Sequence, residues 1–346
     1  MGMINTWKQT FWGIHQNKPV FLFKYENTDG SYAEVTNYGA AIKSVVVPDN
    51  AGVFRNVVLD FPALSGYQND RCYLGATVGR FANRIANASY VHEGYRVCLE
   101  SNDGPHQNHG GCNGFNAQVF DFEINGELLI LYLRSPSGAG GFPGDVFLEV
   151  HYTWSRKREL GIKYIARTTV TTPLNITNHS YFNLSGARSE IWNHKLRVAS
   201  HRVLETSPDY IPTGKIISSE EVYPHNGLSL GENLIHSDTA RGLNDFFILD
   251  PVRTECGKSS PACFLHDPET GRTLEVFTTY PGLQIYTGDF LNSRISDDEC
   301  YGPYEGICLE CQFYPDSPNH KHFPGTFLEP SETYEETIAY CFGLSR

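Results

Sequence analysis

The chain has 346 residues, of which 40% are hydrophobic and 19% are charged. This composition excludes a disordered polyelectrolyte, and the length is sufficient to bury a large core. A formal net charge of −12 argues against nucleic acid or another polyphosphate as a partner.

The cellular location is predicted from two features of the sequence. The segment Met1–His15 has no secretory apolar stretch, and the longest strongly apolar run, Leu128–Leu133, is far below the ~20 residues that a membrane-spanning helix needs. Nine scattered cysteines, an odd number, are typical of reduced thiols. We therefore expect a cytoplasmic protein with no membrane partner.

Alternation of apolar and polar residues predicts β-strands along most of the chain. The clearest example is Leu148–Trp154, where every second residue is apolar and a polar turn leads to another alternating segment at Ile162–Ala166, so a hairpin is expected. Other alternating segments are Ala33–Val47, Val119–Leu133, Lys195–Leu204, Leu274–Thr287, Gly306–Phe313 and Tyr334–Phe342. Helices are expected only near Pro62–Tyr67 and Glu232–Asp238. With no linker or repeat, the pattern predicts one large antiparallel β domain over residues 1–346.

Polar side chains occupy one face of the predicted strand Leu174–Leu184. The alternate residues on that face are Asn175, Thr177, His179, Tyr181 and Asn183. An exposed strand face is the simplest explanation, but such faces usually carry Lys, Glu and Thr. This set of hydrogen-bonding groups favours a wall that holds a polyhydroxy ligand.

A carboxylate occupies the middle of the apolar segment Gly306–Phe313. Burial among apolar neighbours should raise the pKa of Glu310, which would make it a general base near neutral pH. A lone strand glutamate is more often exposed or ion-paired, so this signal is weak by itself. Cys308 and Cys311 form a C-x-x-C pattern, but alternation directs them to opposite faces, which argues against a zinc site.

Three further segments carry polar groups that suit a ligand. Gln284 and Tyr286 share a face in Pro281–Gly288, two arginines and an asparagine lie in Gly79–Ala86, and two histidines precede a glycine pair in His106–Gly111. Guanidinium groups donate several hydrogen bonds, to sugar hydroxyls as well as to carboxylates. The histidines could be metal ligands, but no carboxylate or cysteine partner lies nearby.

These segments resemble the aldose 1-epimerase (galactose mutarotase) family, in the family's order from about residue 20 to the C-terminus. The matching motifs are Gly79–Asn87, His109–Gly111, Gly114–Phe115, Gly141–Gly144, Asn175–Leu184, Ile211–Gly214, Asn244–Asp245, Tyr280–Gly288 and Cys308–Asn319. The Asn-His-Ser-Tyr-Phe-Asn-Leu and Leu-Glu-x-Gln runs are specific when they occur together. The resemblance implies an all-β fold, a large antiparallel β-sandwich of the mutarotase-like supersandwich type.

The resemblance also implies an isomerase that interconverts the α and β anomers of aldohexoses such as galactose and glucose without a metal or cofactor. By motif, Glu310 resembles the general base and His179 the general acid. The sugar-binding residues would be Asn83, Arg84, His109, Tyr181, Asp245 and Gln284. Ring opening, rotation about C1–C2 and reclosure would then proceed by paired proton transfers. A monomer and a homodimer are both compatible with the sequence.

The sequence departs from the family pattern at several positions, which affects substrate preference more than chemistry. The departures are Asn108, Asn116–Phe120, Phe246 and Ser331.

Three alternative functions stay open. A hexose-phosphate epimerase would need extra cations at the site. A glycoside hydrolase needs two carboxylates at the scissile bond, here Glu310 and Asp245, and a non-catalytic sugar-binding protein is the third alternative.

Overall fold

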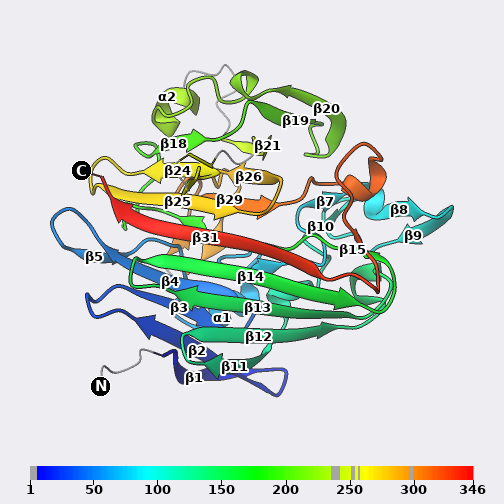
Figure 1. The fold of residues 1–346 in the computed structure, drawn as a ribbon, viewed down its shortest axis with the longest axis horizontal. Helices are drawn as coiled ribbons and strands as arrows, with labels where there is room; N and C mark the ends of the chain where they lie inside the picture. Colours follow the sequence, from blue (N-terminus) through cyan, green and yellow to red (C-terminus); the bar gives the residue numbers. More distant parts are fainter. Residues whose placement is uncertain are drawn as a thin grey trace.

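Three antiparallel sheets of eight, six and five strands hold most of the strands in the computed structural model (Figure 1). The structure describes residues 6–186, 188–234, 242–250, 254–255, 258–295 and 299–345. The prediction of an all-β fold with few short helices is confirmed. Among the described residues, no helix is long and apolar enough to cross a membrane.

The strands of the three sheets follow in their spatial order. The eight-stranded sheet contains β11 (Asp121–Asn125), β12 (Leu128–Ser135), β13 (Val146–Trp154), β14 (Glu159–Thr168), β31 (Tyr334–Leu344), β25 (Arg272–Thr278), β24 (Cys263–His266) and β18 (Lys195–Val198). The six-stranded sheet contains β17 (Tyr181–Phe182), β29 (Ile307–Gln312), β26 (Gly282–Tyr286), β21 (Asn244–Ile248), β19 (Arg202–Thr206) and β20 (Pro212–Ser218). The five-stranded sheet contains β1 (Lys8–His15), β2 (Lys18–Glu26), β3 (Tyr32–Thr36), β4 (Ala41–Pro48) and β5 (Phe54–Asn56).

Short strand pairs and two short helices make up the remaining described elements. The pairs are β6 (Thr77–Val78) with β16 (Thr177–Asn178), β7 (Arg84–Ile85) with β10 (Gln107–Asn108), β8 (Ser89–His92) with β9 (Tyr95–Cys98), β15 (Thr172–Pro173) with β30 (Phe327–Leu328), β22 (Thr254–Glu255) with β23 (Lys258–Ser259), and β27 (Ser293–Arg294) with β28 (Cys300–Tyr301). The helices are α1 (Leu64–Asn69) and α2 (Leu230–Leu234). The second of the two predicted helices extends to Asp238, and its residues 235–238 lie outside the described ranges.

The predicted hairpin is confirmed by β13 and β14, which pair with Val150 opposite Tyr164. Four of the other alternating segments each contain parts of two strands: Ala33–Val47 (β3 and β4), Val119–Leu133 (β11 and β12), Lys195–Leu204 (β18 and β19) and Leu274–Thr287 (β25 and β26). The turn in Ala33–Val47 contains Gly39 and Ala40, both at positive φ. Lys195–Leu204 is divided between two different sheets, because a bend after Val198 redirects the chain.

The main core lies where the inner faces of the three sheets meet. Phe23 of the five-stranded sheet, Val150 of the eight-stranded sheet and Leu309 of the six-stranded sheet belong to the same buried cluster. Burial of this continuous apolar layer, at about 25 cal/mol per Å², is the dominant stabilising contribution to such a fold. One face of β29 packs into this core, and the opposite face carries the polar residues Glu310 and Gln312.

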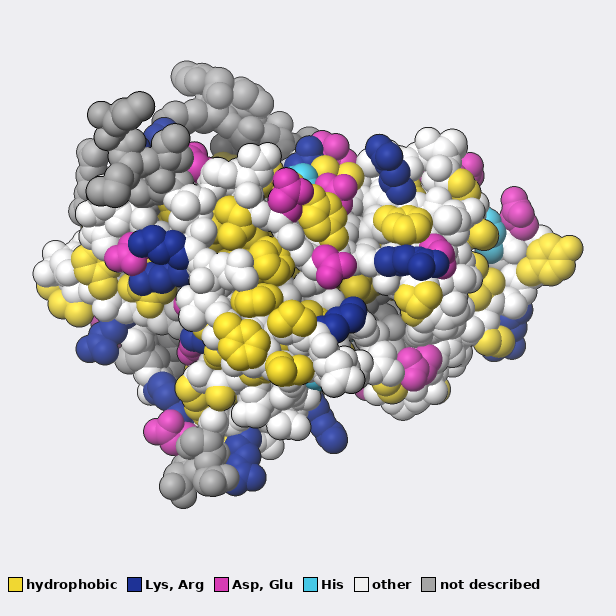
Figure 2. Space-filling view, turned by 90° about the horizontal axis from the view of Figure 1, so that it is seen from below, with side chains coloured by type: hydrophobic (Ala, Val, Ile, Leu, Met, Phe, Trp, Pro, Cys, Tyr) yellow, Lys and Arg dark blue, Asp and Glu magenta, His cyan; other side chains and the backbone are white. Residues whose placement is uncertain are grey.

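The surface carries charges of both signs. On the face in Figure 2, basic and acidic side chains are interspersed, and neither sign forms a continuous patch. This distribution gives that face no electrostatic footprint for a polyanion.

Candidate active site

The candidate site is built on β29, the strand between β17 and β26. All six residues of β29 are buried, with Ile307 and Leu309 in the main core and Glu310 on the opposite face. Glu310 lies directly across from Gln284 of β26. Strand alternation therefore carries a buried carboxyl group to the side of the sheet away from the core.

A cavity of about 220 Å³ opens on this face. It is lined by Cys72, Tyr73, Asn83, Arg84, Asn108, His109, His179, Tyr181, Asn244, Gln284, Tyr286, Phe290 and Glu310. Hydrogen-bonding side chains predominate, and Glu310 is the only carboxylate among the described residues of the lining. Such a surface is suited to a small polyhydroxylated ligand.

His179 is fixed by backbone contacts in the connection between β16 and β17. The backbone N–H of His179 donates to the carbonyl of Ala76 at 2.8 Å, and the backbone carbonyl of His179 accepts from the backbone N–H of Gly75 at 3.0 Å. Gly75 has a φ of +69°, and a Cβ there would lie 2.0 Å from the carbonyl oxygen of Ile42. Only glycine permits this close approach, which places the backbone that holds His179.

His179 and Glu310 form a buried pair. Nε2 of His179 lies 3.6 Å from Oε1 of Glu310, and the two residues are 4% and 2% exposed. Desolvation raises the pKa of Glu310 to about 8, an effect that the charge of Arg84 opposes. Desolvation also lowers the pKa of His179 to about 4. Between these values the pair holds one proton, and in the free site that proton is on Glu310.

His109 packs against the same pair. Its ring lies 5.2 Å from that of His179 and nearly perpendicular to it, and its Nδ1 accepts from the backbone N–H of Asn83 at 3.2 Å. Burial, together with His179 and Arg84, holds the pKa of His109 well below its usual range. His109, His179 and Glu310 each place one ligand atom within 4.8 Å of the others, a set that a transition-metal ion would also use.

A chain of amide hydrogen bonds forms another part of the wall. Nδ2 of Asn83 donates to Oε1 of Gln284 at 3.1 Å, and Nε2 of Gln284 donates to Oδ1 of Asn244 at 2.9 Å. Beside it, Nε of Arg84 donates to a carboxylate oxygen of Asp103 at 2.7 Å. These contacts fix the orientation of the amides and of the cation before any ligand arrives.

A thiol and a phenol contact the other side of the imidazole. Sγ of Cys308 lies 3.6 Å from Nδ1 of His179, and the ring of Tyr181 lies 5.2 Å from the imidazole ring. Burial raises the pKa of the Cys308 thiol well above its usual range, so the sulfur keeps its proton. Nδ1 can carry the one proton of the neutral imidazole and donate a hydrogen bond to the sulfur, which leaves the lone pair of Nε2 facing Glu310.

Seven of the eight residues expected from the sequence line this cavity. They are Asn83, Arg84, His109, His179, Tyr181, Gln284 and Glu310. Asp245 is the exception: it pairs across the sheet with the core residue Ile285, and its carboxylate accepts from the backbone N–H of Asn244. Its neighbour Asn244 occupies the wall instead.

Lining residues that the sequence analysis did not assign include Tyr73, Tyr286 and Phe290. Alternation had placed Tyr286 on the face of Gln284, but it was not among the expected sugar-binding residues. Tyr73 was not detectable, since it lies in a turn at a φ of +61° with no periodic pattern.

The predicted polar wall at Leu174–Leu184 is only partly correct. The segment forms two short strands with irregular connections rather than one strand, and all five polar residues are buried. Asn175 is used inside the protein, where its Oδ1 accepts from the backbone N–H of Phe313 at 2.9 Å. Only His179 and Tyr181 of the five line the cavity.

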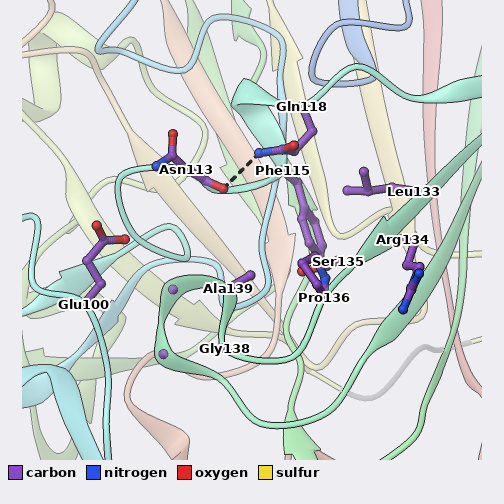
Figure 3. A pocket seen from close by; sticks show the side chains of 12 residues that line it. Glu100, Asn113, Phe115, Gln118, Leu133, Arg134, Ser135, Pro136, Gly138 and Ala139 are labelled. Carbon is purple, nitrogen blue, oxygen red and sulfur yellow. Dashed lines mark hydrogen bonds between the residues drawn. The ribbon is translucent and has the colours of Figure 1, made fainter. Parts of the chain in front are cut away.

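Larger hollows elsewhere lack such a pair. One of about 460 Å³ lies beside the glycine-rich turn at Gly138 and Ala139, with Glu100 and Arg134 at its edges (Figure 3). In its lining, Nε2 of Gln118 donates a hydrogen bond to the backbone carbonyl of Asn113. Another of about 890 Å³ runs beside β19 and β25. Neither combines a buried carboxyl with a buried imidazole among the described residues of its lining. The buried carboxyl–imidazole pair, rather than the size of the cavity, therefore identifies the candidate site.

The fold and the site together define an acid–base enzyme on a large antiparallel β-sandwich. Comparison with known proteins agrees: the aldose 1-epimerase family profile matches residues 22–341. The chain therefore belongs to the aldose 1-epimerase family, a family of isomerases.

Individual relatives span nearly the whole chain. Galactose mutarotase of Bos taurus is 34% identical over 92% of this chain and 93% of its own, and aldose 1-epimerase of Escherichia coli is 31% identical over 94% and 96%. Among solved structures, galactose 1-epimerase from Lactobacillus acidophilus has a TM-score of 0.86 at 26% identity, covering 99% of this chain and 100% of its own. These matches confirm the resemblance found in the sequence motifs and the mutarotase-like fold.

Proposed function

We propose that this protein interconverts the α and β anomers of a neutral aldohexose, such as galactose or glucose, with Glu310 and His179 as its proton-transfer pair. The observation that carries the proposal is the buried pair itself, with Nε2 and Oε1 3.6 Å apart at a polar cavity of about 220 Å³. That volume is below the ~300–1,000 Å³ of ordinary ligand pockets and suits a single sugar ring.

The proton starts on Glu310 in the free site, whereas the expected roles make Glu310 the base and His179 the acid. Oε2 of Glu310 is buried without a hydrogen-bond partner among the described residues. A sugar hydroxyl that donates to this oxygen would favour the carboxylate, because hydrogen bonds to a charged form stabilise it. The proton would then move to Nε2 of His179, which produces the arrangement that ring opening requires.

The reaction follows from this arrangement. The Glu310 carboxylate takes the proton of the C1 hydroxyl while protonated His179 gives one to the ring oxygen, and the bond between C1 and the ring oxygen breaks. The open aldehyde rotates about C1–C2, and the reverse transfers close the other anomer. Each positioned proton transfer contributes about 10²- to 10⁴-fold. The amides of Asn83 and Gln284, with Arg84, would hold the rest of the sugar still.

The direct test is polarimetry of freshly dissolved α-D-galactose and α-D-glucose at neutral pH with a chelator present. Faster relaxation to the same final rotation supports the proposal and a reaction independent of metal. No acceleration, with sugar binding still detectable by calorimetry, would instead support a binding protein.

The pH dependence of kcat/KM is expected to be bell-shaped, because the reaction needs one proton on the pair. Activity should fall below about pH 4, where His179 becomes protonated while Glu310 is still protonated, and above about pH 8, where both groups are unprotonated. The two limbs report apparent pKa values of the pair. Initial rates across pH 3.5–9.5 check this, and a profile flat through pH 9 would contradict the one-proton requirement.

Replacement of Cys308 by Ala is expected to lower kcat by about 3- to 10-fold with a smaller change in KM, because a weak hydrogen bond to Nδ1 of His179 is lost. The acid limb of the pH profile should shift with it. Cys311→Ala is the matched control, since Cys311 is a buried thiol on the core face of the same strand. Equal losses of kcat in both variants would assign Cys308 a purely structural role.

The other interpretations fit the cavity less well. Hydrolysis needs two flanking carboxylates, and Glu310 is the only one in the described lining. A sugar phosphate needs a free cation, and Arg84 is the only cation in that lining and is paired with Asp103. Neutral aldohexoses are therefore the preferred class.

Other properties are part of the same proposal. We place the protein in the cytoplasm, because the eight cysteines in the described ranges are free. We also propose that residues 1–346 act as one domain, as a monomer or homodimer, without nucleic-acid or membrane partners.

A further inference from the structure

The carboxylate of Asp70 lies just after α1, outside the cavity lining, and accepts hydrogen bonds with both oxygens. Oδ1 accepts from the backbone N–H of Cys72 at 2.8 Å, and Oδ2 accepts from the backbone N–H of Leu74 at 2.6 Å. Oδ1 also accepts from the hydroxyl of Ser293 at 2.9 Å. Burial raises the pKa of Asp70, an effect that these hydrogen bonds oppose. The donors are neutral groups, so the contacts fix the positions of the donors rather than balance a cation.

The turn at residues 70–76, the Tyr73 turn, supplies part of the cavity wall. Tyr73 lines the cavity, and its ring lies 4.7 Å from that of His109 and 5.7 Å from that of His179. A φ of +61° is uncommon for a residue with a bulky side chain and persists only where surrounding contacts impose it. The two N–H groups that Asp70 accepts from lie on either side of Tyr73 in the chain, so the carboxylate supplies such contacts.

The same turn carries the groups that hold the backbone of His179. The N–H of Gly75 donates to the carbonyl of His179 at 3.0 Å, and the carbonyl of Ala76 accepts from the N–H of His179 at 2.8 Å. The N–H of Ala76 also donates to the carbonyl of Tyr73 at 3.0 Å, which closes the turn. A displacement of the Tyr73 turn would therefore move both the ring beside the imidazole and the main chain that carries the imidazole.

Ser293 connects the Tyr73 turn to a second segment of the cavity wall. It is the first residue of β27 and is 4% exposed. Phe290, in the connection between β26 and β27, lines the cavity and donates its backbone N–H to the hydroxyl of Tyr286 at 2.8 Å. The carboxylate of Asp70 is thus a direct link between the turn beside the imidazole and the β26–β27 connection.

We propose that Asp70 is a positioning residue of the active site, whose carboxylate holds the Tyr73 turn against His179 and ties it to the β26–β27 connection. This inference rests on the proposed function and adds to it a residue that does not touch the sugar. The amide of Asp70→Asn cannot reproduce the contacts, because one of its terminal atoms is an NH2 donor that would face an N–H or O–H donor in either orientation.

The test is polarimetry of α-D-galactose with Asp70→Asn across pH. We expect kcat to fall about 10- to 100-fold, because small misplacements of reacting groups are costly. KM should change less than about 3-fold, since the amides and the cation of the wall keep their own partners. The acid limb should move up by about one pH unit, because water that enters beside the displaced Tyr73 ring reduces the desolvation that lowers the pKa of His179.

Two further variants separate positioning from stability. Asp267 is 2% exposed and accepts from the hydroxyl of Thr270 at 2.6 Å, in the turn between β24 and β25 and outside the cavity lining. Asp267→Asn should lose stability and keep both kcat per folded molecule and the acid limb. Ser293→Ala removes one hydrogen bond of Asp70 and leaves the carboxylate in place. It should lower kcat about 2- to 5-fold, and it provides the test if Asp70→Asn does not fold.

Each failure has its own signature. If the wild type does not accelerate anomer interconversion, the proposed function is wrong. If the wild type does so and Asp70→Asn keeps the wild-type kcat or an unmoved acid limb, the positioning role is wrong and the proposed function stands. An unfolded Asp70→Asn together with a wild-type kcat in Ser293→Ala would overturn the positioning role in the same way.

Discussion

The variant Glu310→Gln is expected to lose about 10²- to 10⁴-fold in kcat for anomer interconversion, because the amide cannot exchange the proton that the C1 hydroxyl must give up. The amide keeps the size of the side chain and its place opposite Gln284, so sugar binding should persist. Polarimetric rates and calorimetric binding of galactose, measured on the same preparation, separate the two effects.

Stability provides a second readout of the same variant. The pKa of Glu310 is raised in the folded state, so the folded protein binds this proton more tightly than the unfolded chain. The stabilisation from that proton is fully present below the unfolded pKa and is lost as the pH rises through about 8. The neutral amide removes this loss, and the midpoint of thermal unfolding of Glu310→Gln should be at least that of the wild type at pH 8.

A matched carboxyl outside the cavity controls for both readouts. Burial also raises the pKa of Glu336 on β31, where the carboxylate accepts a hydrogen bond from the hydroxyl of Thr279. Glu336→Gln should keep its rate. If Glu310→Gln retained the wild-type kcat, the assignment of Glu310 as the proton-transfer group would be overturned.

His179→Asn is expected to lose a similar factor of about 10²- to 10⁴-fold in kcat, because no group would remain to protonate the ring oxygen. The residual activity should lack the limb near pH 4 and should rise rather than fall as the pH increases through about 8, since only Glu310 would still titrate and it acts as a base when unprotonated. Loss of one limb distinguishes a proton donor from a residue that only shapes the cavity.

His194→Asn is the control for this substitution. His194 is 2% exposed, burial lowers its pKa to about 4, and its Nε2 accepts from the backbone N–H of Leu184 at 2.9 Å, outside the cavity. This variant should lose stability and keep its rate per folded molecule. An intact acid limb in His179→Asn, or equal rates in the two variants, would remove His179 from the mechanism.

Much of the fold was predictable because strand alternation is a local signal. The hairpin of β13 and β14 and the central strand β29 follow from which residues are apolar at every second position. Pairing between distant strands is not local: β31 joins β14 to β25 in the eight-stranded sheet, and no pattern within β31 specifies those partners. Bends after Thr36 and Val198 depend on backbone conformations that alternation does not reveal.

The site shows the same division. Glu310, His179 and Gln284 were predictable, since each lies in a motif or on an alternating face that isolates it. The sequence did not predict that Asn244, rather than Asp245, lines the cavity. Adjacent residues of a strand point to opposite faces of the sheet, so a shift of one residue in the strand's register changes which of the two reaches the cavity. The pKa values also needed the structure, because burial from several elements sets them.

The most direct test of the central claim is saturation transfer between the two anomeric protons of galactose at equilibrium, where no net reaction occurs. The wild type, Glu310→Gln and His179→Asn are compared at neutral pH with a chelator present. Exchange accelerated by the wild type and by neither variant is the predicted result. Exchange equally fast with all three proteins, or no faster with the wild type than without protein, would contradict the account.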